Sequence, residues 1–298
     1  MTLYNADDYG ITALQAENIR RCRGEGCLTG VSAMPNSPYL PETMAAIAED
    51  KALHVAVHIN LTEGLCLSKP SDVPLLARAD GRFYPSFTRL LRLSVTKPKA
   101  LHTQLKREIA AQIDRVLPLL AGRGLRLDGH QHIQMMPAVL HAVRDVLSEK
   151  GLTAEYIRWS CEPLSPYLRH MALWRDYPPV NVVKNLVLNT LGLFSRRYMR
   201  DMGQKRGAVM GLVISGNLEY RLVSALLQVP ARTGAVAVPP IFASDATAAV
   251  KMSIWRTFAR MIMMTTWMIR IMNPAKSHAG ALPMADRSAR EAISATTL

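Results

Sequence analysis

Cysteine is scarce in this chain of 298 residues, which contains only four, namely Cys22, Cys27, Cys66 and Cys161. They stand at irregular intervals and include no CxxC pair, so a disulfide framework is excluded and a reducing compartment is favoured. The start of the chain, MTLYNADDYG, also lacks the basic residues and the apolar run of a secretory peptide. We therefore expect a cytoplasmic protein.

Acidic residues are also few: 23 Asp and Glu stand against 36 Lys and Arg, which gives a formal charge of +13. Such an excess can indicate an anionic partner. Residues 246–298 hold seven basic and two acidic residues, and the rest of the excess is spread over the first 245 residues. No basic stripe is interleaved with aromatics, which make up 6% of the chain. We therefore expect no nucleic-acid partner.

Several other patterns are missing. The sequence has no internal repeat, no convincing linker and no phosphate loop of the GxxxxGK(S/T) or GxGxxG type, so nucleotide-dependent chemistry has little support. What is present is an ordinary globular composition, with 49% hydrophobic and 20% charged residues and a mean hydropathy of +0.06. A chain of this length and composition can bury a sizeable core, which excludes disorder as a whole.

Short apolar runs alternate with helical stretches over the first 160 residues, which predicts an α/β domain with a parallel sheet. Strands are expected at 2–5, 27–34, 52–61, at the strand end formed by 126–132, and at 156–160. Helices are expected up to about residue 23 and at 41–51, 101–120 and 137–150. Residues 64–88 predict a long loop that sets specificity. Later strands are expected at 209–214 and 235–238.

Three segments with chemically active side chains lie at the ends of predicted strands: Asn5–Gly10 (NADDYG), His58–Gly64 (HINLTEG) and Asp128–His132 (DGHQH). The carboxyl ends of parallel strands meet on one face of a barrel or at one edge of an open sheet. One carboxylate and two imidazoles from three strands make a set that holds a divalent metal and leaves positions open for water and substrate. The three segments together predict a metal site at the C-terminal strand ends.

Each segment also has an ordinary structural explanation. Asp-Asp before Tyr-Gly is by itself most often a turn with a helix cap, and His58 alone suits a satisfied core histidine. His130 and His132, two apart on a strand, place both rings on one face, which is a better metal signal. At a bend after the strand, Asp7 and Asp8 can reach different parts of one site. One carboxylate then binds the metal, and the other accepts a proton from water.

These segments resemble a known family. NADDYG, HINLTEG and LDGHQH are similar to the signature segments of the YdjC-like carbohydrate deacetylases, which include chitooligosaccharide deacetylase and hopanoid-biosynthesis-associated members. LARADGRFY (76–84) resembles the loop after the second signature, and the likeness is close over about the first 160 residues. It implies a TIM-like (β/α) barrel with about seven strands, and metal-dependent removal of the N-acetyl group from an amino sugar in an oligosaccharide or glycolipid.

Carried over position by position, the resemblance assigns roles to eight residues. The metal ligands implied are Asp8, His58 and His130. Asp7 is implied as the general base, and His132 as a catalytic histidine in or beside the ligand shell. Substrate contacts are expected at Asn60, Thr62 and Glu63. The implied cofactor is one divalent ion, Mg²⁺ or Zn²⁺, while the same donors also accommodate Mn²⁺, Fe²⁺ or Co²⁺.

The C-terminal part departs from the family. Near the last strand, members carry a His-Pro-Gly-like segment, whereas residues 235–244 read AVAVPPIFAS and only His278 lies later, so no general acid is assigned. Residues 246–298 are basic and hold seven of the 16 methionines. We expect a barrel domain at 1–245 and an atypical helical extension at 246–298. A shifted reading frame from about residue 235 is one hypothesis for the change in composition.

Several alternatives stay open. Residues 252–272 suit either peripheral contact with a membrane surface or a helix packed on the barrel. The protein is an active deacetylase, a catalytically impaired sugar-binding descendant or a metal-dependent phosphoesterase, because an Asp-His-His site also suits phosphate. The expected partner is a small-molecule or oligosaccharide substrate, and a homodimer is compatible with the sequence.

Overall fold

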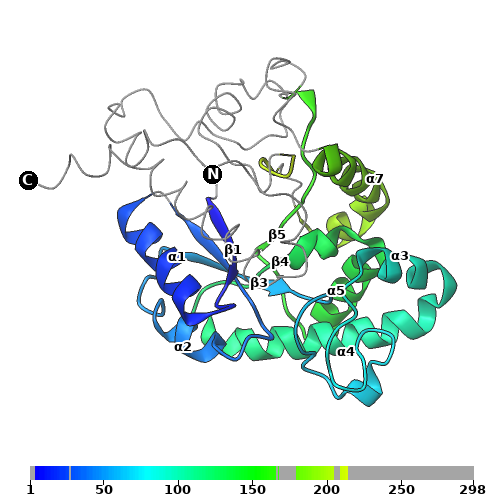
Figure 1. The fold of residues 1–298 in the computed structure, drawn as a ribbon, viewed down its shortest axis with the longest axis horizontal. Coiled ribbons are helices and arrows are strands. Elements are labelled where there is room, and N and C mark those ends of the chain that lie inside the picture. The colour runs from blue at the N-terminus through cyan, green and yellow to red at the C-terminus, as the bar shows by residue number, and fades with distance from the viewer. Residues whose placement is uncertain (1–3, 27, 166, 168–178, 205–208, 214–298) are drawn as a thin grey trace, which may run out of the picture. The chain divides into compact units, whose positions relative to one another are not determined.

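The structure, a computed structural model, describes residues 4–26, 28–165, 167, 179–204 and 209–213 (Figure 1). All of them belong to the first of the two units into which the chain divides, residues 1–262. The predicted strand 235–238, the predicted extension 246–298 and the helix expected at 252–272 lie outside the described residues. In the described part of the chain, no helix is long and apolar enough to cross a membrane.

Within the described residues, five strands form one parallel sheet in which each strand pairs with the next strand of the chain (Figure 1). They are β1 (Asn5–Tyr9), β2 (Gly30–Ala33), β3 (His54–Ile59), β4 (Arg126–Gly129) and β5 (Tyr156–Ile157). The predicted α/β fold with a parallel sheet is confirmed. Because the strands are parallel, all five carboxyl ends lie at one edge of the sheet.

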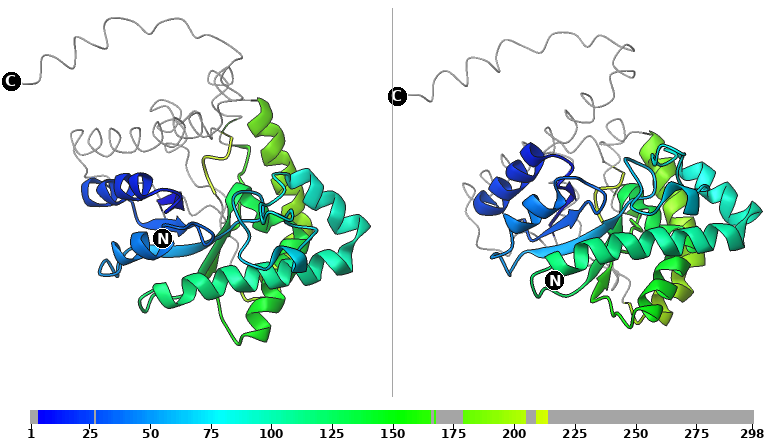
Figure 2. Two further views of the ribbon diagram at one scale, coloured as in Figure 1. Left: turned by 60° about the horizontal axis from the view of Figure 1, so that its bottom comes forward. Right: turned by 90° about the horizontal axis from the view of Figure 1, so that it is seen from below.

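Helices connect the strands and follow one another around the outside of the sheet (Figures 1 and 2). They are α1 (Ala13–Glu25), α2 (Leu40–Ala45), α3 (Phe87–Thr96), α4 (Pro98–Val116), α5 (Pro137–Glu149) and α7 (Pro179–Asp201), with the 3₁₀ turns η1 (Pro70–Asp72), η2 (Leu117–Leu119) and η3 (His130–Met135). Several of these helices begin at a residue that suits a helix N-terminus. Thr12 accepts from the N–H of Gln15, and Ser86 from that of Arg89, each at 3.1 Å. Prolines occupy the first turns of α2, α4 and α5.

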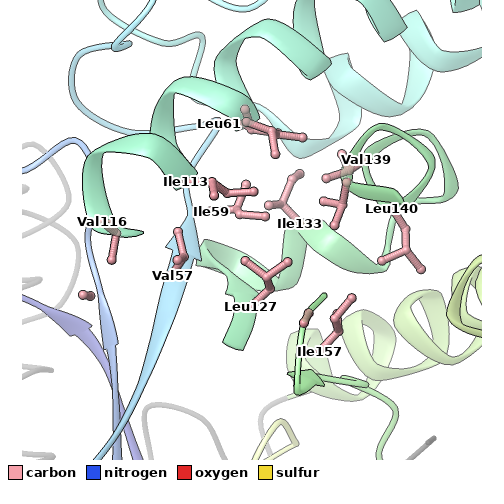
Figure 3. Close-up of a cluster of buried hydrophobic side chains, with 14 of the residues drawn as sticks. Val57, Ile59, Leu61, Ile113, Val116, Leu127, Ile133, Val139, Leu140 and Ile157 are labelled. Carbon is pink, nitrogen blue, oxygen red and sulfur yellow. The ribbon is translucent and has the colours of Figure 1, made fainter. Parts of the chain in front are cut away.

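Alternation along the strands gives the sheet two different faces. On the outer face, Val55, Val57 and Ile59 of β3 are fully buried. Leu127 of β4 pairs in register with Val57, and Ile157 of β5 pairs with Leu127. Figure 3 shows Val57, Ile59, Leu127 and Ile157 in one cluster with residues of α4 and α5. Each such side chain stabilises the fold by about 1.5–3 kcal/mol when fully buried.

The opposite face of the sheet, here called the polar face, carries Ser32 of β2, His58 of β3 and Asp128 of β4, all of them buried. Arg158, directly after β5, joins them and is also buried. Burying charged groups is costly unless they are paired and hydrogen-bonded. The polar face is therefore stable only because its members bind one another.

The first strand begins later than the sequence predicts. Within the described residues β1 covers Asn5–Tyr9, whereas the strand was predicted at 2–5, of which residues 2 and 3 lie outside the described part, so the two aspartates lie inside the strand and not in a turn after it. Asn5 donates to Ser32 Oγ of the neighbouring strand at 2.7 Å. That contact joins residues 27 apart in the chain, so a local pattern could not show that pairing continues through Asp-Asp.

Other boundaries also differ. The helix predicted at 41–51 ends early, as α2, at Ala45, whereas α4 begins before residue 101 and ends at Val116. The long loop after residue 64 is confirmed, with η1 inside it and α3 beginning at Phe87. No strand forms at 209–213, the described part of the strand predicted at 209–214. The N–H groups of Gly211 and Val213 donate instead to the Glu162 carboxylate at 2.6 and 2.8 Å.

Candidate metal centre

The two neighbouring carboxylates of β1 face different partners because the strand is irregular between them. Asp8 has a φ of +63°, in the left-handed region that residues other than glycine seldom occupy. The pairing of β1 with β2 also slips between Ala6 and Tyr9, and such a bulge re-aims a side chain. The side chain of Asp8 faces His58, whereas that of Asp7 faces Arg158. The sequence predicted a bend after the strand, whereas in the structure the irregularity lies within β1, at Asp8.

Asp8, His58 and His130 form one compact group, here called the inner cluster. Asp8 Oδ1 lies 3.2 Å from His58 Nε2 and 2.8 Å from His130 Nδ1, and one ligand atom from each residue lies within 4.8 Å of the other two. Ligands about 2.0–2.2 Å from a metal ion lie roughly 3–3.5 Å from one another. The side chains of Asp8 and His130 remain 19% and 11% exposed, which leaves the cluster open on one side. Donor types and spacing both fit a divalent cation.

Two residues to which the sequence gave no role complete the polar face. Asp128 Oδ1 lies 2.6 Å from His58 Nδ1, which fixes the ring and directs Nε2 toward Asp8. The other carboxylate oxygen of Asp128 accepts from Ser32 Oγ at 2.5 Å and lies 2.6 Å from Arg158 Nη2. Asp128 stands in the DGHQH segment and Arg158 in the predicted strand 156–160. Their partners depend on the register of the sheet, which no local motif shows.

Asp7 is held by Arg158 in a two-pronged ion pair. Arg158 Nη1 and Nη2 each donate to one oxygen of Asp7 at 2.8 Å, and Asn5 Nδ2 donates at 2.8 Å as well. The surrounding protein disfavours the charge, but the guanidinium outweighs this effect and holds the pKa of Asp7 well below its usual range. Asp7 is therefore an ionised carboxylate beside the inner cluster, with 38% of its side chain exposed.

The carboxylates also set the protonation of the two inner histidines. Burial works against the charge on His58, but Asp128 and Asp8 outweigh it and raise its pKa to about 10. Burial likewise opposes the charge on His130, and Asp8 and Glu63 raise its pKa to about 9. The pKa of Asp8 is held below its usual range by the same two imidazoles, against burial. Both imidazoles are protonated at neutral pH, so a metal that binds here displaces protons.

His132 is not placed as the His-x-His pattern predicted. β4 ends at Gly129, and Gln131 and His132 have φ of +53° and +59°, so the two histidines do not share the face of a strand. A Cβ at Gly129 would lie 2.7 Å from Gln134 Oε1, so the chain folds back closely over this glycine. His132 Nδ1 lies 3.1 Å from Ser160 Oγ, and burial lowers its pKa to about 4. Its imidazole is neutral and stands outside the inner cluster.

Hydrogen bonds within the HINLTEG segment shape its turn, and others join it to α4. Asn60 is fully buried: its Oδ1 accepts from the N–H groups of Thr62 and Glu63, and its Nδ2 donates to the Glu63 carbonyl. Thr62 is buried as well. The Glu63 side chain is 52% exposed and its Oε1 lies 3.3 Å from His130 Nε2. Glu63 lies beside the inner cluster, whereas Asn60 shapes the turn, and substrate contact by the three residues stays a prediction.

Comparison with known proteins gives the family. A model of the YdjC-like protein family matches residues 3–256. The chain belongs to this family, and the likeness of its three signature segments is thereby confirmed.

Curated relatives match about half of the chain. Carbohydrate deacetylase of Danio rerio is 29% identical over 159 residues, which cover 53% of this chain and 49% of that protein. Chitooligosaccharide deacetylase of Enterobacter sp. (strain 638) is 26% identical over 51% of this chain and 57% of that protein, and carbohydrate deacetylase of Mus musculus is 26% identical over 49% and 47%. The chain thus spans about half the length of the curated relatives that it matches.

A solved structure was also found. The crystal structure of a candidate cellobiose-phosphate cleavage protein of Enterococcus faecalis has a TM-score of 0.45 and 16% identity, over 68% of this chain and 94% of that chain.

Proposed function

We propose that this protein is a metal-dependent hydrolase that removes the N-acetyl group from an N-acetylated amino sugar, in an oligosaccharide or a glycolipid. The observation that carries the proposal is the inner cluster, Asp8, His58 and His130, with the ionised carboxylate of Asp7 beside it. Membership of the YdjC-like family and the names of the deacetylase relatives support the same chemistry.

The reaction consumes water and yields acetate and a free amine. A divalent cation, Mg²⁺ or Zn²⁺, held by the inner cluster supplies Lewis-acid chemistry toward the amide carbonyl and toward water. Asp7 accepts the proton of the attacking water. Arg158 holds Asp7 in place and keeps it ionised. The proton that Asp7 takes from water is the one that the departing amine must receive, and His132, neutral in this site, is the proposed second catalytic group.

We also propose that the five-stranded sheet is part of a TIM-like (β/α) barrel with about seven strands. Each strand lies next to its sequence neighbour, with no reversal of strand order, and the helices lie outside the strands (Figure 1). The polar face then lines the interior at the carboxyl ends of the strands. The domain limits 1–245 and 246–298, the cytoplasmic location, the homodimer and the membrane contact of 252–272 stay predictions.

Acetate release tests the proposed function. Protein stripped with a chelator and then reloaded with Mg²⁺ or Zn²⁺ is given N-acetylglucosamine oligosaccharides and N-acetylated glycolipids, and acetate is measured. We expect release only by reloaded protein. Asp7→Asn should lower the rate by roughly 10²–10⁴-fold, the usual contribution of general acid–base catalysis, with the metal still bound.

The matched control is Asp114→Asn, which removes the partner of Lys150 at the surface and should leave the rate unchanged. Sugar binding without acetate release would instead indicate the catalytically impaired descendant. Turnover of a phosphodiester and of no acetamide would indicate the phosphoesterase.

A further inference from the structure

A second group of metal-ligating side chains, here called the outer cluster, lies between α4 and α5, which pack together outside the sheet (Figures 1 and 2). It consists of His102 on α4 and of His141 and Asp145 on α5. Asp145 Oδ2 lies 3.0 Å from His102 Nε2 and 3.3 Å from His141 Nε2. His141 and Asp145 are four residues apart and therefore share one side of their helix. None of the three has a role in the proposed reaction.

Neighbouring side chains hold the outer cluster in place. The imidazole of His141 contacts two other rings, that of His102 at 4.3 Å and that of Tyr198 on α7 at 5.0 Å between centroids. Arg144 donates to Asp145 Oδ1 from Nε at 2.9 Å and from Nη2 at 2.8 Å. The other oxygen of Asp145 is thus left facing the imidazoles. Ligands that are already oriented lose little conformational freedom when they bind an ion.

Protonation and access also suit a metal ion. Nδ1 of His102 has no hydrogen-bond partner among the described residues, so it can carry the ring proton while Nε2 binds an ion. The three side chains are between 25% and 35% exposed, which lets water reach the remaining coordination positions.

We propose that His102, His141 and Asp145 bind a second divalent transition-metal ion, such as Zn²⁺ or Co²⁺, with water completing its coordination. The spacings of 3.0 and 3.3 Å match the roughly 3–3.5 Å between ligands of a tetrahedral ion. Arg144 offsets much of the charge of Asp145, which disfavours Mg²⁺ and Ca²⁺, because these ions depend on several oxygen ligands. Imidazole nitrogen favours Zn²⁺ and Co²⁺. This site is independent of the proposed function.

An ion in the outer cluster joins α4 to α5 and, through the ring of Tyr198 on His141, supports the packing of α7. Because the ion binds only the folded chain, it stabilises the fold by an amount that rises with the logarithm of its concentration over its dissociation constant. The outer ion therefore has a structural role, between α4 and α5 and away from the polar face.

Cobalt titration of the chelator-stripped, untagged chain tests the proposal. Bound Co²⁺ is followed by visible absorption and counted by atomic absorption. We expect two equivalents for the wild type, and the loss of one in His141→Gln and in Asp145→Asn. Glu149→Gln is the matched control, since Glu149 also lies on α5 and pairs with Lys106 of α4. It should keep both equivalents, and a tenfold excess of Mg²⁺ should not displace the outer Co²⁺.

Two results would overturn the proposal: two equivalents retained by both outer variants, or one equivalent in the wild type that Asp8→Asn abolishes. A measurement on the unchanged protein covers the case in which the variants do not fold. Diethylpyrocarbonate modification, followed by mass spectrometry, should slow at His102 and His141 when Zn²⁺ is present and stay unchanged at His54. Equal modification with and without Zn²⁺ at His102 and His141 would also contradict the site.

Discussion

The inner and the outer cluster contain the same donors, two histidines and one aspartate, yet their surroundings differ. The inner cluster is carried by β1, β3 and the turn after β4, and three more carboxylates, those of Asp7, Asp128 and Glu63, lie against it. The outer cluster is carried by two helices, and its further charged neighbour is the guanidinium of Arg144. The donor set alone therefore does not decide what a site does.

The difference lies in what each cluster can do with a bound water. Asp7 is an ionised, partly exposed carboxylate beside the inner cluster, and in the proposed reaction it accepts a proton from a water held there. In the outer cluster the one carboxylate, Asp145, is itself a proposed ligand, so it is not free to accept a proton from a bound water. We therefore assign catalysis to the inner cluster and a structural role to the outer one.

The largest expected contrast is in the pH dependence of metal binding. The pKa of His58 is about 10 and that of His130 about 9, so both protons must leave when the inner cluster binds an ion. Lowering the pH then weakens binding, by about 100-fold per pH unit below pH 9, because each displaced proton contributes tenfold. His141 is already neutral at pH 7, so the outer cluster should depend on pH less steeply.

Co²⁺ titrations at pH 6, 7 and 8 measure both slopes, with Asp145→Asn isolating the inner cluster and Asp8→Asn the outer one. Equal slopes for the two variants would contradict this assignment of protonation states.

The next largest contrast concerns the arginine beside each cluster. Arg158→Met leaves two carboxylates, Asp7 and Asp128, without their buried cation, and we expect a loss of about 3–5 kcal/mol in the free energy of unfolding. Arg144→Met removes a side chain that is 33% exposed, and should cost at most about 1 kcal/mol. Urea denaturation of the chelator-stripped proteins measures both. Similar losses would show that the polar face does not depend on its buried cation.

A smaller effect is expected from the carboxylate behind His58. Asp128→Asn keeps the size of the side chain but removes the charge that orients His58 Nδ1, so the affinity of the inner cluster should fall about 10–100-fold. Metal competition with a chromophoric chelator measures the change. Unchanged affinity would mean that the strand alone holds the ring, and Ser32→Ala would then be expected to have no effect either.

The smallest expected effect is that of an outer-cluster substitution on the rate of acetate release. Asp145→Asn should leave the rate of acetate release within about twofold of the wild type. Surface substitutions away from the core and from buried ion pairs usually change free energies by about 0.5 kcal/mol or less. Initial rates with reloaded protein check this prediction. A large loss of rate, with the inner ion still bound, would show that the two clusters are coupled.

The arrangement of elements could be read in large part from the sequence. The apolar run 52–61 contains β3, and the helix predicted at 137–150 differs from α5 by one residue, because both patterns are local. The sequence also predicted Asp8, His58 and His130 as one ligand set, and the structure brings these three together. Strand ends that carry such residues converge whenever the strands are parallel.

The partners of these residues could not be read in the same way. Arg158 binds Asp7, which lies 151 positions earlier in the chain. Its charge can be buried only because two carboxylates from other strands, Asp7 and Asp128, bind it. The bulge at Asp8 and the left-handed turn at His132 are backbone conformations that tertiary packing imposes. The outer cluster needs α4 beside α5, and helix periodicity does not say which helices are neighbours.

The sequence by itself therefore determined the alternation of strands and helices and which side chains stand at the strand ends, because both depend on residues near one another in the chain. Only the tertiary structure decided which nitrogen faces which oxygen, which carboxylate lies with the two imidazoles and which pairs with the arginine, and which groups are buried with a counter-charge. Those outcomes depend on sheet register and on contacts between distant segments, where a shift of one residue moves a side chain to the other face.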